Sequence, residues 1–237
     1  ELMTSHTWED KPIDLDVWLP QFVFNRYVVN NEYARKAWDI LRKTVYTVAT
    51  DKLIRDGAES ILQGRPTLDS FTRWTKTKLN YAAKDLLPAW DAMIKASDGC
   101  KNSDGFQFDL VDITRQVLAN YALPLQRKFI DAYEEKDPNY FKKYSRQFIE
   151  LIEDIDKLLA TRKDFLLGRW IADARKCGNT ESEKHLYEIN AKDLITLWGD
   201  KDCPLNEYAC KQWSGLLNDF YRQRWKQFFT RLEEAIA

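Results

Sequence analysis

The stretch DPNYFKKYSRQFIELIEDIDKLLA, residues 137–160, decides the fold class. Its apolar side chains recur at intervals of three and four residues, which is the period of an amphipathic α-helix. They are Phe141, Tyr144, Phe148, Leu151, Ile152, Ile155 and Leu159. Asp137 followed by Pro138 is a typical helix start, because Asp caps free amides and Pro fits the first turn. The sequence therefore predicts a helix over 138–160.

The same period recurs along most of the chain. It predicts one helix beginning near Asp16 and others over about 31–48, 81–96, 108–135, 164–178, 180–199 and 207–235. We expect Pro124 to kink or split the fourth of these. Thr180 and Glu183 have the spacing of a capping box at the start of the 180–199 helix. Residues 50–78 lack a sustained apolar stripe and are predicted to be a long connection.

No segment shows sustained alternation of apolar and polar residues, so the sequence predicts negligible sheet. Gly and Pro are also scarce, at 8 and 7 residues, whereas a β-sandwich or barrel needs many turn residues. Connections between neighbouring helices are short, which favours antiparallel packing. We therefore predict an all-α fold, a bundle of mostly antiparallel long helices forming one domain over 16–237.

The balance of charge excludes several function classes. The 36 basic and 37 acidic side chains give a net charge of -1, and no basic stripe stands out that could bind nucleic acid or a membrane surface. No apolar run approaches the roughly 20 residues that span a bilayer. The chain begins with neither an initiator Met nor the basic and apolar regions of a signal peptide. We therefore expect it to be a fragment of a longer protein.

Catalytic and metal-binding motifs are missing from the sequence. It contains no nucleophile elbow, no Gly-rich phosphate loop and no HExxH motif. The 4 cysteines and 2 histidines match no zinc spacing, so we predict neither a metal site nor a cofactor. Cys203 and Cys210 either pair across a short loop or remain free thiols.

Carboxylates on helical stripes are expected to have structural roles. Glu150, Glu153, Asp154 and Asp156 alternate with apolar residues, as on a solvated helix face. Asp109, Asp112 and Arg115 lie on a strongly apolar helix, where Asp112 and Arg115 have the spacing of an ion pair. We interpret them as a partly buried ion pair that locks helices together, in preference to a ligand contact.

Trp198 and Tyr208 are the candidate binding residues. A helix is predicted to end at the Trp198–Gly199 step, an irregular loop follows, and Tyr208 opens the next helix. Both side chains offer a flat apolar face with a polar edge, which suits a sugar ring. From spacing alone, packing of the two helix ends explains them more simply.

Five stretches, in order along the chain, resemble the C-terminal region of the α-N-acetylglucosaminidases of glycoside hydrolase family 89. They are Trp38–Tyr46, Phe108–Gln116, Phe165–Arg175, Thr196–Gly199 and Tyr208–Gln212, the last running on into the segment Tyr221–Phe228. The resemblance implies a parent protein with a small N-terminal domain, a (β/α)₈-type catalytic barrel and this helical domain. Residues 1–15 would then be the linker from the upstream barrel.

The family cleaves terminal α-linked N-acetylglucosamine from glycans with retention, using two glutamates of the barrel. The resemblance thus implies no catalytic residue in this chain, which alone should be inactive. It implies that the helical domain packs on the barrel and walls the substrate pocket with Trp198 and Tyr208. The loop 200–206 carries Cys203 and Pro204 where the family is richer in Gly, which leaves any substrate contact from that loop open.

The resemblance also implies a lysosomal protein or an exported bacterial one. The alternative function, from another class, is a stand-alone helical scaffold or protein-interaction module without sugar chemistry. In that case the aromatic residues at the helix ends are simply packed.

Overall fold

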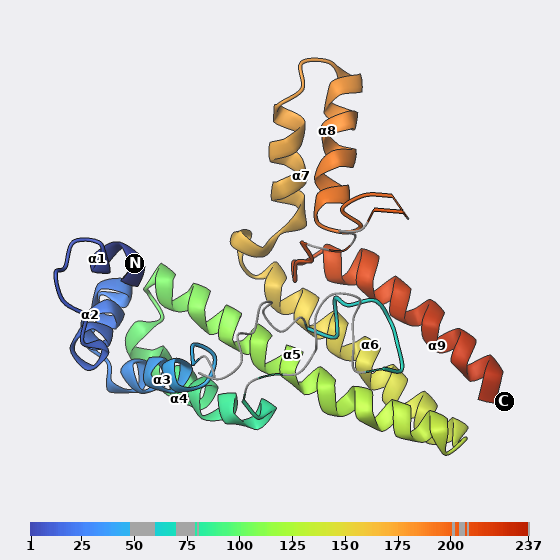
Figure 1. Cartoon of the computed structure of the whole chain (residues 1–237), viewed down its shortest axis with the longest axis horizontal. Helices are drawn as coiled ribbons and strands as arrows, with labels where there is room; N and C mark the ends of the chain where they lie inside the picture. Colours follow the sequence, from blue (N-terminus) through green and yellow to red (C-terminus); the bar gives the residue numbers. More distant parts are fainter. Residues whose placement is uncertain are drawn as a thin grey trace. The chain divides into compact units, whose positions relative to one another are not determined.

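The computed structural model describes residues 1–47, 60–69, 79, 81–200, 202–203, 207 and 209–236. In these residues the protein is all-α, as predicted, and its only bridge between extended segments joins Leu166 to Ser214. The helices are α1 Leu2–His6, α2 Leu15–Tyr27, α3 Glu32–Lys43, α4 Leu87–Cys100, α5 Asp104–Glu134, α6 Pro138–Ala160, α7 Leu167–Lys176, α8 Glu181–Leu194 and α9 Arg222–Ile236 (Figure 1). Short 3₁₀ turns cover Ala83–Leu86 and Lys163–Phe165, and a π-helical turn, η3, covers Leu217–Tyr221.

Several predicted helix starts are confirmed. The Asp137 carboxylate accepts hydrogen bonds from the amides of Asn139 and Tyr140, both at 3.0 Å, and begins α6. Asn31 caps α3 in the same way. Thr180 and Glu183 form the predicted capping box at the start of α8. These starts were predictable because each cap acts within three residues of itself.

Other boundaries were predicted wrongly. Helix α5 continues through Pro124, so the predicted split does not occur, while the predicted kink stays a prediction. Helix α7 begins after Leu166 without a side-chain cap, and Asp164, the predicted start of this helix, pairs with Arg162 at 2.8 Å. The predicted 31–48 helix ends at Lys43, the 180–199 helix at Leu194, and the last helix begins at Arg222.

The predicted connection over 50–78 lies largely outside the described residues, and its described part, 60–69, contains turns and no helix. No helix of the described residues combines the length and the apolar character needed to cross a bilayer.

The chain forms two compact units. The first contains Glu1–Lys52 and Asn80–Thr114, and the second contains Leu53–Leu79 and Arg115–Ala237. Helix α5 contributes residues to both. Residues 1–15, predicted as a linker, include α1, none of whose side chains is buried. The single domain over 16–237 and its linker remain predictions.

Small side chains hold α3 against α4 in the first unit. Ala34 and Ala37 of α3 are fully buried, as are Ala89 and Ala96 of α4. Alanines at such a contact let two helix axes approach closely, and larger neighbours such as Met93 then fill the space beside them.

A buried carboxylate joins α2 to α5 in the same unit. Asp109, 6% exposed, forms an ion pair with Arg26 and accepts a hydrogen bond of 2.8 Å from the Tyr27 hydroxyl. The Tyr27 oxygen in turn accepts from the indole of Trp38 at 2.7 Å. Burial, and then the Asp109 charge, raise the pKa of the Tyr27 phenol, so it stays a donor at every ordinary pH. Asp109 thus has the helix-locking role predicted for this part of the sequence, through a partner on another helix.

The second unit is built on an aromatic core. Phe129 of α5, Phe148 of α6 and Trp225 of α9 meet with ring centroids 4.6 to 6.0 Å apart, and Phe229 joins them. Edge-to-face contacts of this kind add to the gain from burying apolar area. Figure 1 shows α6 and α9 running side by side in opposite directions. Of the five tryptophans that fall on apolar helical faces, only Trp225 is fully buried; Trp18, Trp38, Trp90 and Trp170 are partly exposed.

We predict that Asp109→Ala destabilises the protein by about 3 kcal/mol, because it leaves Arg26 without its anion and Tyr27 without its acceptor in a buried setting. The loss is measured as a lower midpoint of urea unfolding. The control is Asp91→Ala, which removes an exposed pair with Lys95 at 2.7 Å and should leave the midpoint unchanged. Equal effects of the two substitutions would contradict a special role for Asp109.

Candidate functional site

The candidate site is the segment that connects α8 to α9 in the second unit. Trp198, predicted to contact a sugar, lies near its start and is half-buried. Tyr208, the other predicted contact, lies outside the described residues. The structure therefore tests the surroundings of Trp198 and the residues on either side of Tyr208, namely Glu207 and the chain from residue 209 onward.

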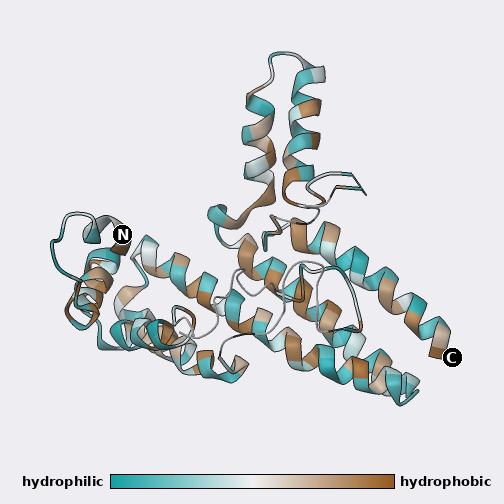
Figure 2. Ribbon diagram, in the orientation of Figure 1, coloured by the Kyte–Doolittle hydropathy of each residue, from teal (hydrophilic) through white to brown (hydrophobic). Residues whose placement is uncertain are grey.

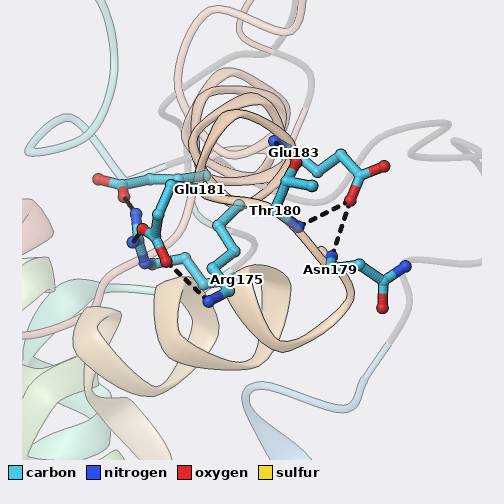
Figure 3. Close-up of polar contacts among 7 residues, drawn as sticks. Arg175, Asn179, Thr180, Glu181 and Glu183 are labelled. Carbon is cyan, nitrogen blue, oxygen red and sulfur yellow. Dashed lines mark hydrogen bonds and ion pairs between the residues drawn. The ribbon is translucent and has the colours of Figure 1, made fainter.

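The α7–α8 hairpin leads into this segment and is fixed at its turn (Figure 3). Glu183 accepts hydrogen bonds from the amides of Asn179 at 2.8 Å and Thr180 at 3.0 Å. Arg175 of α7 bridges to two carboxylates of α8, Glu188 at 2.7 Å and Glu181 at 3.2 Å. These contacts join the two helices at the end of the hairpin opposite Trp198.

The chain turns sharply where α8 ends. The Trp198 amide donates to the Asp193 carbonyl at 2.7 Å, and Trp198 has a φ of 67°. A positive φ is unfavourable for a bulky residue by about 1–2 kcal/mol, so the surroundings must hold it in place. Strained residues of this kind concentrate at binding sites, which is the structural reason to keep Trp198 as a candidate.

Glu207 closes the segment on itself. Its amide donates to the Leu197 carbonyl at 2.9 Å, and its own φ is 63°. Its side chain is 6% exposed, and its Oε1 accepts from Arg224 at 2.8 Å and from Arg65 at 3.1 Å. The Arg224 guanidinium lies 5.2 Å from the centre of the Phe220 ring. We call Glu207, Arg65 and Arg224 the carboxylate clamp.

The rest of the segment is bound by side chains from elsewhere in the unit. Arg115 donates to the Gln212 side chain at 3.2 Å, and Gln63 donates to the Cys210 carbonyl at 3.4 Å. Asp156 of α6 accepts from the Gly215 amide at 2.7 Å and from the Asn218 amide at 3.1 Å. Asp156 thus caps the π-helical turn that precedes α9.

The structure changes the interpretation of two carboxylates in this region. Asp156 caps η3, and Glu153 pairs with Arg222, so neither belongs to a purely solvated face, while Glu150 and Asp154 are exposed as predicted. In the part of the chain that the structure describes, no disulfide joins Cys203 to Cys210. Among the described residues, no group of His, Cys, Asp and Glu could hold a metal ion.

Sequence reasoning missed the carboxylate clamp and the Asp156 cap. Both join residues far apart in sequence, and nothing in the local pattern at Arg65 or Asp156 indicates a distant partner. The adjacency of an acidic residue to Tyr208 was the one available sign, and it is common in helices.

Comparison with known proteins identifies the family. The model of the α-N-acetylglucosaminidase (NAGLU) C-terminal domain matches residues 18–237. The chain belongs to this family. It is similar to human α-N-acetylglucosaminidase, with 31% identity over 100% of the chain and 31% of the human protein.

The family resemblance extends to three-dimensional structure. A family 89 glycoside hydrolase from Clostridium perfringens, solved with its substrate GlcNAc-α-1,4-galactose, superimposes with a TM-score of 0.92 and 32% identity. The same organism's family 89 enzyme in complex with PUGNAc gives a TM-score of 0.93. In both, the chain is covered to 98% and the bacterial protein to 27%, so the chain spans less than a third of these relatives.

The hairpin of this NAGLU C-terminal domain should weaken in acid. Hydrogen bonds from the amides of Thr180 and Asn179 lower the pKa of Glu183 below its ordinary 4.5. A carboxyl with a lowered pKa in the folded state stabilises that state above its unfolded pKa, and the contribution is lost as pH falls through the folded pKa. We expect carboxyl NMR to give a lower pKa for Glu183 in the native chain than in the urea-unfolded chain.

The control for this prediction is Glu183→Gln. It should weaken the hairpin already at pH 6 and reduce the further loss between pH 6 and pH 3, seen as broadening of the Asn179 and Thr180 amide signals. An equal pKa for Glu183 in the native and unfolded chains would show that the capping box does not bind the ionised form preferentially.

The turn at Gly199 should tolerate no side chain. A Cβ at Gly199 would lie 2.9 Å from the Cβ and 3.0 Å from the Sγ of Cys203. We predict that Gly199→Ala lowers the free energy of unfolding by about 1–2 kcal/mol, and that adding Cys203→Gly restores part of it. Gly168→Ala in α7, where a Cβ meets nothing within 4 Å, should not destabilise. A neutral Gly199→Ala would show that the segment can shift freely.

Proposed function

We propose that this chain forms the helical part of a retaining exo-α-N-acetylglucosaminidase, which hydrolyses terminal α-linked N-acetylglucosamine from glycans. The observation that carries the proposal is the similarity, at 31–32% identity over essentially the whole chain, to the human enzyme and to a bacterial enzyme solved with GlcNAc-α-1,4-galactose. In this proposal the two catalytic glutamates belong to the upstream barrel, and this chain supplies binding surface and support.

Trp198 and, by its place in the sequence, Tyr208 are the proposed contacts to the terminal sugar. An aromatic ring can lie against the apolar C–H face of a pyranose while its polar edge hydrogen-bonds to a hydroxyl. Trp198 meets two requirements of such a contact, because it is half-buried and its backbone is held in an unfavourable conformation. A half-buried ring keeps a surface that a ligand can cover.

The exposed apolar side chains of α8 support the proposal that this helix packs on a large partner such as the catalytic barrel. Leu186 and Ile189 are 54% and 48% exposed, and Leu197 beyond the helix end is 44% exposed. The side of α8 that carries Ala191 and Glu188 contacts α7, whereas Leu186 and Ile189 are exposed on other sides of the helix. Figure 2 shows hydrophobic residues along α8 as well as hydrophilic ones.

The competing function is a stand-alone helical interaction module, and the same apolar surface of α8 favours it. The two functions differ at Trp198. A pocket residue affects the handling of substrate, whereas a packing residue affects only stability.

We predict that Trp198→Ala, made in the whole protein that includes the barrel, lowers kcat/KM for a nitrophenyl α-N-acetylglucosaminide about 10-fold to 100-fold, the loss expected for one large apolar contact. Trp198→Phe should lose less. The control is Tyr140→Ala, which removes a 53% exposed aromatic residue of α6 and should leave kcat/KM unchanged. The thermal midpoint of each variant is measured alongside.

Unchanged turnover in folded Trp198→Ala would favour the interaction module. The 237-residue chain by itself should show no hydrolysis, because both proposed catalytic glutamates lie outside it. Hydrolysis by the isolated chain would contradict that assignment of the chemistry.

A further inference from the structure

Glu207 of the carboxylate clamp is bonded to the residue that precedes Trp198. The amide of Glu207 is bonded to the carbonyl of Leu197 at 2.9 Å. Leu197 immediately precedes Trp198, and Glu207 immediately precedes Tyr208. One backbone hydrogen bond therefore joins the residue before Trp198 to the residue before Tyr208.

The conformation at this hydrogen bond is unfavourable on both sides. Trp198 and Glu207 have φ values of 67° and 63°, in the left-handed region that side chains disfavour. Each would relax to a negative φ if the segment were released, and the relaxation would turn the chain leaving that residue. The backbone at Trp198 is held by its own amide bond to Asp193 and, through Leu197, by whatever holds Glu207.

Electrostatics holds Glu207. Its carboxylate is 6% exposed and is contacted by Arg224, 21% exposed, and Arg65, 49% exposed. A carboxylate with so little solvent around it needs counter-charges close by, and the two guanidinium groups provide them. Among the described contacts, the Nη1 atom of Arg224 has no hydrogen-bond partner, so Arg224 depends on Glu207 in return.

The two arginines are themselves fixed to the core of the unit. Arg224 precedes Trp225, whose indole is fully buried and donates to the Leu62 carbonyl at 3.1 Å. That bond anchors the stretch that carries Arg65, and Gln63 of the same stretch donates to the Cys210 carbonyl. The clamp therefore connects the rigid aromatic core to the base of the candidate site.

We propose that Glu207, held by Arg65 and Arg224, is a positioning residue for substrate binding: it fixes the segment so that Trp198 faces the terminal N-acetylglucosamine. This inference rests on the proposed function. Glu207 does not touch the sugar in this proposal and acts through Trp198.

The test compares Glu207→Gln, Trp198→Ala and the double variant in the whole enzyme. Glutamine keeps the size of the side chain and removes its charge. We expect Glu207→Gln to raise KM for the nitrophenyl substrate, and the inhibition constant of 2-acetamido-1,2-dideoxynojirimycin, by about 10-fold with a smaller change in kcat. The double variant should lose much less than the product of the two single losses, because both act on one contact.

Glu188→Gln is the matched control. Glu188 is also bridged by two cations, Arg175 at 2.7 Å and Lys192, but on the hairpin away from the segment. It should leave KM unchanged. If Glu207→Gln folds too poorly to assay, Arg65→Gln keeps the Glu207–Arg224 pair and should raise KM by a smaller factor.

The outcomes separate this inference from the proposed function. If Trp198→Ala raises KM but Glu207→Gln and Arg65→Gln lower only the thermal midpoint, the clamp has a purely structural role and the inference is overturned. If the losses of the two single variants multiply in the double variant, the two residues act independently, and the inference is overturned as well. If Trp198→Ala itself changes nothing, the proposed sugar contact fails first.

Discussion

The described residues between α8 and η3 lie almost entirely outside helices, so their backbone polar groups need other partners. Buried amides and carbonyls without partners are costly, so each must find one. In the second unit they are bonded to the Leu166 region, to Asp156 and to Gln63, and the turn is closed by Glu207. The geometry of the candidate site depends on these contacts, since no regular element sets the direction of the segment.

Those contacts fix the segment only because the side chains that make them belong to rigid helices. Asp156 belongs to α6 and Arg224 to α9, and both helices are fixed by Phe148 and Trp225 in the aromatic core. Burial of such rings is the main source of stability, whereas the hydrogen bonds contribute direction. A change in the core would therefore be expected to reach Trp198 through Arg224 and Glu207.

The sequence predicts what acts locally and misses what acts at a distance. Helix α6 follows from its apolar period, and the caps at Asp137 and Thr180 follow from residues within one turn. The extent of the last helix does not, because residues 207–216 satisfy the helix pattern yet are bound by side chains from other elements. Trp198 and its turn were predicted as the end of a helix, but its positive φ arises from contacts that the sequence alone does not reveal.

In each unit, a buried carboxylate forms an ion pair between two parts of the chain that pack in a fixed register. Asp109 joins α2 to α5 in the first unit, and Glu207 joins the segment after α8 to α9 in the second. A well-packed apolar contact could be as stable, because desolvating an ion pair costs about as much as the attraction returns. An ion pair, however, is lost if the two parts of the chain shift by one residue relative to each other, whereas an apolar contact tolerates such a shift. At Glu207 that distinction matters most, because its amide is bonded to the residue before Trp198, the proposed sugar contact.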